Sequence, residues 1–350
     1  MPSPSDTFQH FIQQGKGMSM DVEHVPKLTR RNFIRMSAGL TMATGLCLPA
    51  TADARPPQGL ATIIDLTLCD GCPDREIPAC VAACRDLYQH TVPDPVDPIP
   101  KPFPRGMIED WSGKKQVFDR LTPYNFIFVE KVDLEYEGRR MTLHIPRRCM
   151  HCDNPACATI CPFTANHKFK NGAVVINKNL CVGGAKCRTV CPWHIPQRQS
   201  GVGIYLYFLP TLAGNGAMFK CNLCYDRLQE HKIPGCMEAC PQDAMIIGPR
   251  DAIYKEALER AQRINGFIYG NDENGGTATL YVSPVPFDIL DRKLPTGPGH
   301  PHFKHVTRRM EETALLEKSV LAAPALGVAA GVIGALSLRS RRRNHTKGDE

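Results

Sequence analysis

Short apolar segments alternate with polar loops through the body of the chain. The segments at 61–66 and 173–176 have the length of single β-strands, and each leads into a loop that contains cysteine. Apolar stretches at 125–132 and 141–145, with Glu137-Gly138 between them, predict a β-hairpin. Together with the helices described next, these strands predict an α+β fold.

Helical segments complete the pattern. Residues 251–264 place apolar and charged positions at helical spacing and stop at Asn265-Gly266, which predicts a surface helix. The apolar segment 203–209 is too short to span a membrane, and we expect a strand in the core or at a subunit contact there, with a membrane-touching loop as the alternative. Prolines repeated between 93 and 104 predict a stiff, extended connector. Four short helices are expected to carry the later cysteines of four cysteine groups, at 81–86, 158–161, 188–191 and 237–240.

The N-terminal end has the pattern of an export signal. The pair Arg30-Arg31 precedes an apolar stretch at 36–48, and Ala52-Asp53-Ala54 then has the form of a cleavage site. This order predicts a twin-arginine signal peptide over 1–54. Translation from Met18 or Met20 is the alternative to a start at Met1. An ordinary amphipathic N-terminal helix is the alternative.

The C-terminal end has the pattern of a membrane anchor. Residues 319–338 contain no charged side chain, and as a helix they would cross about 30 Å of hydrocarbon. Four arginines follow within 339–343, and the positive-inside rule assigns such a cluster to the cytoplasmic side. We therefore expect a single-pass anchor with the body of the protein at the periplasmic face, although a buried core helix is the alternative.

These patterns divide the chain into four parts. We expect a signal peptide over 1–54, a ferredoxin-like domain over 55–250, an extension of a helix and a hairpin over 251–313, and the anchor with its basic tail over 314–350. The net charge of +7 does not change this picture, because the two ends carry more than half of it and the body has no basic stripe. A nucleic-acid partner is therefore not expected.

Sixteen cysteines require a chemical explanation. Cys47 lies in the predicted signal, and the fifteen others are an odd number that paired disulfides cannot use completely. They gather at 69–84, 149–161, 181–191 and 221–240, mostly at gaps of two or three residues, which favours metal or cluster ligation. Every group ends in Cys-x3-Cys, and in three groups a proline follows.

Iron–sulfur clusters explain this spacing best. Zinc is the main competitor for a Cys-x2-Cys pair, but four groups with one shared ending favour clusters. No Cys-x2-Cys pair is followed by histidine, which excludes covalent c-type haem. We find no dinucleotide, phosphate-loop or nucleophile motif, so no catalytic residue is predicted.

The motifs resemble a known family. The segments 148–152 (Arg-Cys-Met-His-Cys) and 220–224 (Lys-Cys-Asn-Leu-Cys), with the signal and the anchor, resemble the exported four-cluster ferredoxin-like subunits of membrane-bound respiratory oxidoreductases. The resemblance covers most of residues 28–345 and is strongest to the iron–sulfur subunit of Hyb-type nickel–iron hydrogenases. It implies two ferredoxin-like dicluster modules, in which the first and fourth cysteine groups share two clusters and the second and third share two more.

The resemblance also implies a ligand set for each cluster. Cluster 1 would be held by Cys69, Cys72, Cys80 and Cys240, and cluster 2 by Cys221, Cys224, Cys236 and Cys84. Cluster 3 would be held by Cys149, Cys152, Cys157 and Cys191, and cluster 4 by Cys161, Cys181 and Cys187 alone. Gly184 stands where a fourth ligand of cluster 4 is expected, so we expect three [4Fe-4S] clusters and one [3Fe-4S] or incompletely ligated [4Fe-4S] cluster.

A non-catalytic, electron-transferring subunit is the function that the resemblance implies. Electrons would pass between an exported catalytic subunit, a nickel–iron hydrogenase, and an integral membrane subunit that reacts with quinone. A formate dehydrogenase or another molybdenum enzyme is the alternative catalytic partner. A membrane-tethered structural zinc protein is the alternative of a different class.

Overall fold

The computed structural model describes residues 59–310, except 104–105, 209 and 212–214. The predicted signal peptide over 1–54 and the predicted anchor over 319–338 lie outside these described residues. Described residues up to Val306 belong to one unit, and 307–310 belong to a second. None of the helices in the described ranges has the length and hydropathy of a membrane span.

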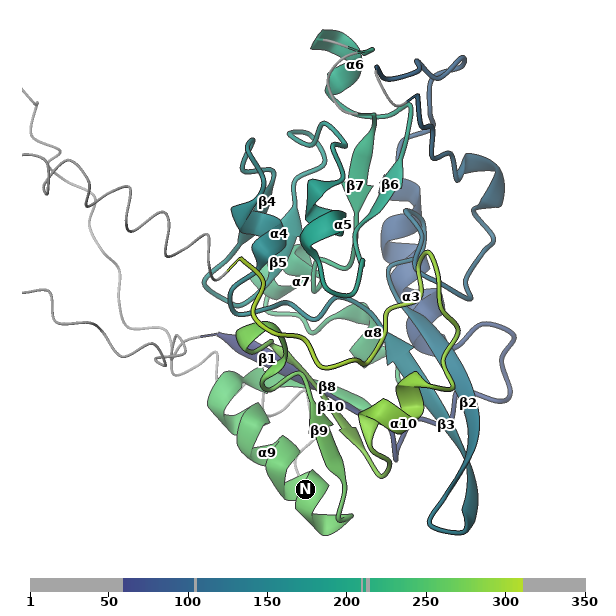
Figure 1. The fold of residues 1–350 in the computed structure, drawn as a ribbon, viewed down its shortest axis with the longest axis vertical. Coiled ribbons are helices and arrows are strands. Elements are labelled where there is room, and N and C mark those ends of the chain that lie inside the picture. Colours follow the sequence, from purple (N-terminus) through teal and green to yellow (C-terminus); the bar gives the residue numbers. More distant parts are fainter. Residues whose placement is uncertain (1–58, 104–105, 209, 212–214, 311–350) are drawn as a thin grey trace, which may run out of the picture. The chain divides into compact units, whose positions relative to one another are not determined.

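A four-stranded sheet brings together segments that are far apart in the sequence (Figure 1). Strand β1 pairs in parallel with β10, so that Ile64 lies opposite Tyr281, and it pairs antiparallel with β8 on its other side. All six residues of β1 are buried, which agrees with its continuous apolar sequence. The sheet order is β8 (Met245–Pro249), β1 (Leu60–Asp65), β10 (Thr279–Ser283) and β9 (Phe267–Tyr269).

Helix α9 (Arg250–Arg263) covers one face of this sheet (Figure 1). It turns Ile253, Ala257 and Ala261 inward, and their spacing of four residues places them on one helical face. They pack against Ile63 and Leu280 of the sheet. The helix predicted at 251–264 is confirmed. It packs on the sheet that contains β1, and strands β9 and β10 of the predicted extension belong to that sheet.

The predicted hairpin is also confirmed. Strands β2 (Phe128–Tyr136) and β3 (Arg139–Arg147) are antiparallel over nine residue pairs. Their two-residue turn holds Glu137 and Gly138 at φ of 51° and 74°, the left-handed conformation that tight hairpin turns require. Two smaller antiparallel pairs follow, β4 (Asn166–Lys168) with β5 (Val174–Ile176) and β6 (Gln197–Gln199) with β7 (Ala217–Phe219).

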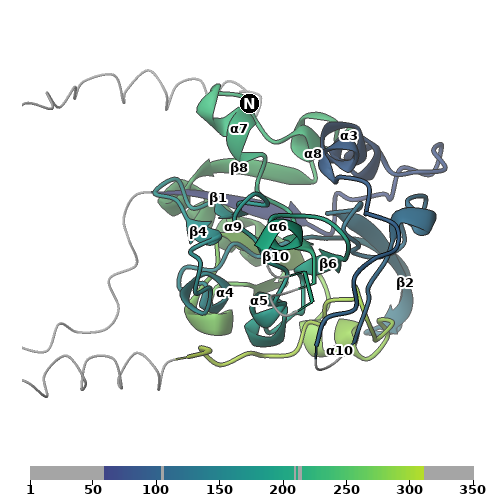
Figure 2. The same ribbon diagram turned by 90° about the horizontal axis from the view of Figure 1, so that it is seen from above.

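Short helices occur near the four predicted places. They are α3 (Ala79–Tyr88), α4 (Ala156–Thr159), α5 (Lys186–Val190) and α8 (Gly235–Glu238). The first carries Cys84 as expected, together with Cys80, but the other three end before Cys161, Cys191 and Cys240, and the prediction that they carry these last cysteines is wrong. Figures 1 and 2 show them as two contacting pairs, α3 with α8 and α4 with α5. The remaining helices are α6 (Tyr205–Phe208), α7 (Tyr225–Gln229), α10 (Phe287–Asp291) and the 3-10 turns η1 (Gln89–Thr91), η2 (Ser112–Lys114) and η3 (Glu273–Gly275).

The strand predicted at 203–209 is wrong. The structure has helix α6 there, with Tyr205 buried but Tyr207 and Phe208 exposed at 86% and 70%. The segment is apolar at nearly every position, so it carries neither a two-residue nor a 3.6-residue period to distinguish strand from helix. Gly203, at φ of 101°, marks the turn that precedes the helix.

One buried acid in the hairpin predicts a pH-dependent stability. Glu130 of β2 lies 3.4 Å from Nδ1 of His300, and burial raises the pKa of its carboxyl from 4.5 to about 7, against the lowering effect of Arg147. Burial also lowers the pKa of His300, so burial favours the neutral form of both groups. Because the folded pKa is raised, this stabilisation is complete below about pH 4.5 and is lost as pH rises through 7.

We therefore expect stability to fall by about 2 kcal/mol between pH 5 and 8, less than the full shift implies because solvent screens part of the effect. The Glu130→Gln variant should lack this component. Urea midpoints of the anaerobically purified holoprotein at the two pH values test it. Equal pH slopes for the wild type and the variant would contradict the assignment.

Candidate metal centres

Four cysteines from the first and fourth cysteine groups line one small cavity. Cys69 and Cys72 come from the loop after β1, Cys80 from α3, and Cys240 from the residues just after α8. The rest of the wall is mainly apolar and includes Val129 of the hairpin. These are the four residues expected to hold cluster 1.

A second small cavity has the same plan. Cys221 and Cys224 come from a loop, Cys236 from α8, and Cys84 from α3. These are the four residues expected to hold cluster 2. The two cavities are closely similar in size, and each is lined by three cysteines of one group and one cysteine of the other.

The exchange of cysteines depends on the contact between α3 and α8. Cys80 and Cys84 are four residues apart and therefore lie on one face of α3, one at each cavity. Gly235 begins α8 within this contact, and a Cβ there would lie 2.4 Å from Cδ1 of Leu87, the end of a flexible side chain on α3. Leu87 therefore packs directly on the backbone at the start of α8.

The second and third cysteine groups come together around α4 and α5. Burial raises the pKa of the Cys191 thiol, and the nearby sulfurs of Cys157, Cys152 and Cys149 raise it further. These are the four residues expected to hold cluster 3.

The three residues expected at cluster 4 also lie together. Burial raises the pKa of Cys187 to about 12, with further contributions from Cys181 and Cys161 as well as from Cys157. The shared Cys157 contribution indicates that the two expected sites are neighbours.

The loop at Gly184 keeps the backbone of a ligand loop. In all four loops the residue at the third position is left-handed, and these residues are Gly71, His151, Gly183 and Leu223, at φ of 76°, 48°, 70° and 58°. Gly184 itself has no left-handed φ, and a Cβ built on it would have no atom within 4 Å. All four loops thus share the left-handed third residue. At the next position Gly184 resembles Cys152, which is not left-handed, whereas Cys72 and Cys224 have φ of 58° and 49°. The third loop lacks the thiol.

The donor set fits clusters better than single metal ions or disulfides. In the described part of the chain, all fifteen cysteines are free. No three His, Cys, Asp or Glu side chains of the described residues lie close enough to share one metal ion. Thiolates around one Zn²⁺ at about 2.3 Å would be within roughly 4 Å of one another, so the wider spacing suits a cluster with several irons. Burial raises the pKa of Cys69 to about 11, and binding to iron would displace that proton.

Comparison with known proteins agrees with this geometry. The 4Fe-4S dicluster domain family matches residues 68–165 and, separately, residues 141–250. The "Protein NrfC homolog" of Haemophilus influenzae is 30% identical over 241 residues, which cover 66% of this chain and 86% of that protein. The chain belongs to the 4Fe-4S dicluster family.

Other relatives of this dicluster protein are subunits of oxidoreductases or are encoded with them. The "Hydrogenase-2 operon protein HybA" of Escherichia coli O157:H7 is 29% identical over 92% of this chain and 99% of that protein. A subunit of the anaerobic dimethyl sulfoxide reductase of E. coli K12 is 38% identical over 108 residues, 31% of this chain and 46% of that subunit. The dicluster protein is thus an iron–sulfur electron-transfer subunit and not a catalytic one.

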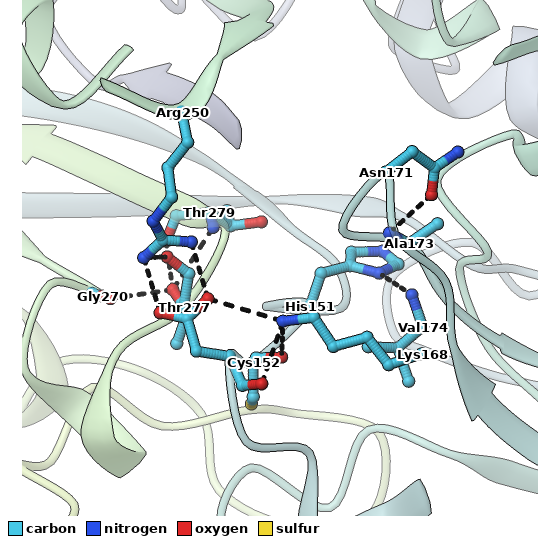
Figure 3. A network of polar contacts seen from close by, with 11 residues as sticks. His151, Cys152, Lys168, Asn171, Ala173, Val174, Arg250, Gly270, Thr277 and Thr279 are labelled. Carbon is cyan, nitrogen blue, oxygen red and sulfur yellow. Dashed lines mark hydrogen bonds and ion pairs between the residues drawn. The ribbon is translucent and has the colours of Figure 1, made fainter. Parts of the chain in front are cut away.

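A buried ion-pair network holds the loop that contains Cys152 (Figure 3). Arg250 donates two hydrogen bonds to the Asp153 carboxylate, at 2.6 and 2.5 Å, and both side chains are at least nine-tenths buried. Lys168 donates to the carbonyls of Cys152 and Asp153, at 2.9 and 3.0 Å. Arg250 also donates to the carbonyl of Thr277 next to β10, so the network ties this loop to the sheet.

Removing Arg250 should destabilise the dicluster protein strongly. The Arg250→Met variant leaves the Asp153 carboxylate buried with Lys168 at 3.5 Å as its remaining ion-pair partner, and such a loss costs about 3 kcal/mol. We expect a lower urea midpoint of the holoprotein and faster iron loss to a chelator.

A variant on the same helix and a double variant control this prediction. Arg263→Met removes an exposed arginine of α9 and should change stability by less than about 0.5 kcal/mol. Arg250→Met combined with Asp153→Asn should recover part of the loss. Equal effects of Arg250→Met and Arg263→Met would contradict the role of the buried pair.

Several residues of the site were not predicted as functional. Arg148, His151 and Lys220 are buried beside the cysteine ligands, although each lies within a cysteine motif that the sequence shows plainly. The signal available was their position, because Arg148 and Lys220 each immediately precede the first cysteine of a group. Asp153 and Arg250 had no comparable signal, since their pairing joins positions 97 residues apart.

Proposed function

We propose that this chain holds four clusters and relays electrons between an exported nickel–iron hydrogenase subunit and a quinone-reactive membrane subunit. The observation that carries the proposal is the exchange of cysteines between α3 and α8, which lines two neighbouring cavities with four thiols each. Bound clusters would supply one-electron redox chemistry, and several of them at short spacing would form a path through the protein.

The ligands are assigned group by group. We assign cluster 1 to Cys69, Cys72, Cys80 and Cys240, and cluster 2 to Cys84, Cys221, Cys224 and Cys236. Cluster 3 is assigned to Cys149, Cys152, Cys157 and Cys191. Cluster 4, assigned to Cys161, Cys181 and Cys187, is proposed to be a [3Fe-4S] cluster because Gly184 offers no ligand.

The hydrogenase partner is favoured by the extent of the similarity to HybA. That similarity covers 99% of HybA, whereas the similarity to the dimethyl sulfoxide reductase subunit covers 46% of that subunit and is compatible with any dicluster protein. The proposed location is the periplasmic face of the cytoplasmic membrane. It rests on the sequence patterns of the signal over 1–54 and the anchor over 319–338.

Anaerobic purification of the full chain from membranes in mild detergent tests the proposal. We expect a nickel-containing catalytic subunit and an integral membrane subunit to copurify, and about fifteen irons per chain. A molybdenum-containing partner would overturn the hydrogenase assignment. Zinc in place of iron, with no sulfide and no broad visible absorption, would overturn the electron-transfer function itself.

A further inference from the structure

Arg148 and Lys220 are buried positive charges without a carboxylate partner. Their exposed fractions are 2% and 6%, and no Asp or Glu among the described residues lies within ion-pairing distance of either. Arg250, another buried arginine, has Asp153 as its counter-ion. A buried cation is costly without a counter-ion, so the surroundings of Arg148 and Lys220 require an explanation.

Arg148 lies at the wall of the cavity proposed for cluster 2. Its guanidinium donates to Oγ1 of Thr62 at 2.6 Å and to the Cys149 carbonyl at 3.3 Å, which leaves its Nε buried without a hydrogen-bond acceptor. The same cavity is lined by the sulfur-bearing side chains of Cys221 and Cys236. The negative neighbours of Arg148 are therefore cluster ligands.

Lys220 occupies the corresponding place toward the proposed cluster 3. Its ammonium group donates to the carbonyls of Val174 and Cys221. The backbone N–H of the same Val174 donates to Nδ1 of His151, which lies in the ligand loop of the proposed cluster 3. Lys220 thus lies beside the loop of cluster 3 while it precedes a ligand of cluster 2 in the chain.

His151 links the same two sites. The backbone N–H of Val174 donates to its Nδ1 at 3.0 Å, which leaves the ring proton on Nε2. Nε2 lies 3.6 Å from Sγ of Cys221, so a histidine of the second cysteine group can donate to a sulfur of the fourth. The three nitrogen-bearing side chains therefore gather where the two dicluster modules meet.

The two outer sites differ in their charges. No Lys or Arg lines the cavity of the proposed cluster 1, and Arg188 and Arg198, beside the loop of the proposed cluster 4, both pair with the Glu109 carboxylate. The residue before the first cysteine of a group is Arg148 or Lys220 at the two inner loops, but it is Leu68 or Leu180 at the loops of the proposed clusters 1 and 4. Both leucines are exposed, at 42% and 47%. The cations are thus placed at the inner pair of sites.

We propose that Arg148 and Lys220 raise the reduction potentials of the inner clusters 2 and 3 relative to those of the outer clusters 1 and 4. A fixed positive charge stabilises the reduced, more negative form of a neighbouring cluster, and it does so most strongly where water is excluded. An electron that enters at cluster 1 or cluster 4 then resides mainly on cluster 2 or cluster 3. This inference rests on the proposed four-cluster function.

Redox titration followed by EPR on the anaerobically purified full chain tests the inference. Arg148→Gln and Lys220→Gln should each lower the reduction potential of at least one inner cluster by about 59 mV, which corresponds to a tenfold smaller equilibrium constant for its one-electron reduction. The outer clusters should keep their potentials. Arg148→Lys and Lys220→Arg, which retain the charge, should titrate like the wild type.

Arg147→Gln is the matched control. Arg147 is equally buried and adjacent in sequence, but it stacks on the Phe303 ring at 3.8 Å and donates to the Pro301 carbonyl, away from the cysteines. Its replacement should lower stability and leave all potentials in place.

Three results would overturn the inference. They are unchanged inner potentials in Gln variants with full iron content, equal shifts at the outer clusters, or a tenfold shift in the charge-retaining variants. The last result still decides the question if the Gln variants fail to assemble. Iron and sulfide content of the wild type tests the four-cluster proposal separately, since a chain with fewer clusters would overturn that proposal whatever the potentials of the variants.

Discussion

The Gly184→Cys variant is expected to lose the oxidised three-iron EPR signal that we expect in the wild type, and to gain one iron per chain. The backbone is ready for the change, because Gly184 has no left-handed φ and its Cβ would enter open space. The preceding Gly183 supplies the left-handed turn that the other three ligand loops also have. A thiolate at 184 would therefore follow the same turn as Cys152, the second ligand of the second loop.

Two further variants separate the thiol from the side chain as such. Gly184→Ala adds the same Cβ without sulfur and should keep the three-iron signal. Gly184→Ser offers an oxygen and should give at most a weakly bound fourth iron. If the wild type contains sixteen irons and no three-iron signal, the assignment of cluster 4 is wrong; if Gly184→Cys leaves the signal intact, the loop does not face the cluster.

Cys80→Ser and Cys84→Ser are expected to remove different clusters, although both residues lie on one face of α3. Cys80 lines the cavity with Cys69, Cys72 and Cys240, whereas Cys84 lines the cavity of the fourth group. Each substitution should remove up to four irons and the EPR signal of one cluster. The protein should remain an assembled subunit with the other clusters in place.

Double variants show which cysteines share a cluster, because two ligands of one cluster cannot lose it twice. Cys84→Ser combined with Cys221→Ser should lose no more iron than either single variant. Cys84→Ser combined with Cys69→Ser should lose about twice as much. The reverse pattern would mean that each group holds its own cluster, which contradicts the exchange between α3 and α8.

The sequence predicted the local elements of this fold well and its long-range pairings poorly. The β2–β3 hairpin, the helix at 250–263 and the four short helices follow from local periodicity and turn residues, and all are present. The parallel pairing of β1 with β10 had no local signal, because it depends on burial against residues more than 200 positions away. The prediction of a strand at the α6 segment failed because a continuous apolar run has no period that distinguishes a strand from a helix.

The candidate site was predictable where chemistry requires a fixed spacing. Cysteines at short intervals predicted ligand loops, and two of the expected sets of four, those of clusters 1 and 2, each line a common cavity. Buried charges such as Arg148 and the Asp153–Arg250 pair were not predictable as a class, because a charged residue in a loop is ordinarily solvated. Only the tertiary fold determines which of them lose their water.

The shared cavities also impose an order on the synthesis of the protein. Cys240 follows Cys69 by 171 residues, and β10, which pairs with β1, ends at Ser283. At ribosomal rates of about 5–20 residues per second, the first thiols to emerge wait roughly 10 to 35 seconds for their last partner. During that time β1 has neither of its neighbouring strands. Clusters 1 and 2 can therefore be fully ligated only after Cys236 and Cys240 have been made, about two thirds of the way along the chain. A nascent chain that stalls earlier presents reactive thiols and the unpaired strand β1.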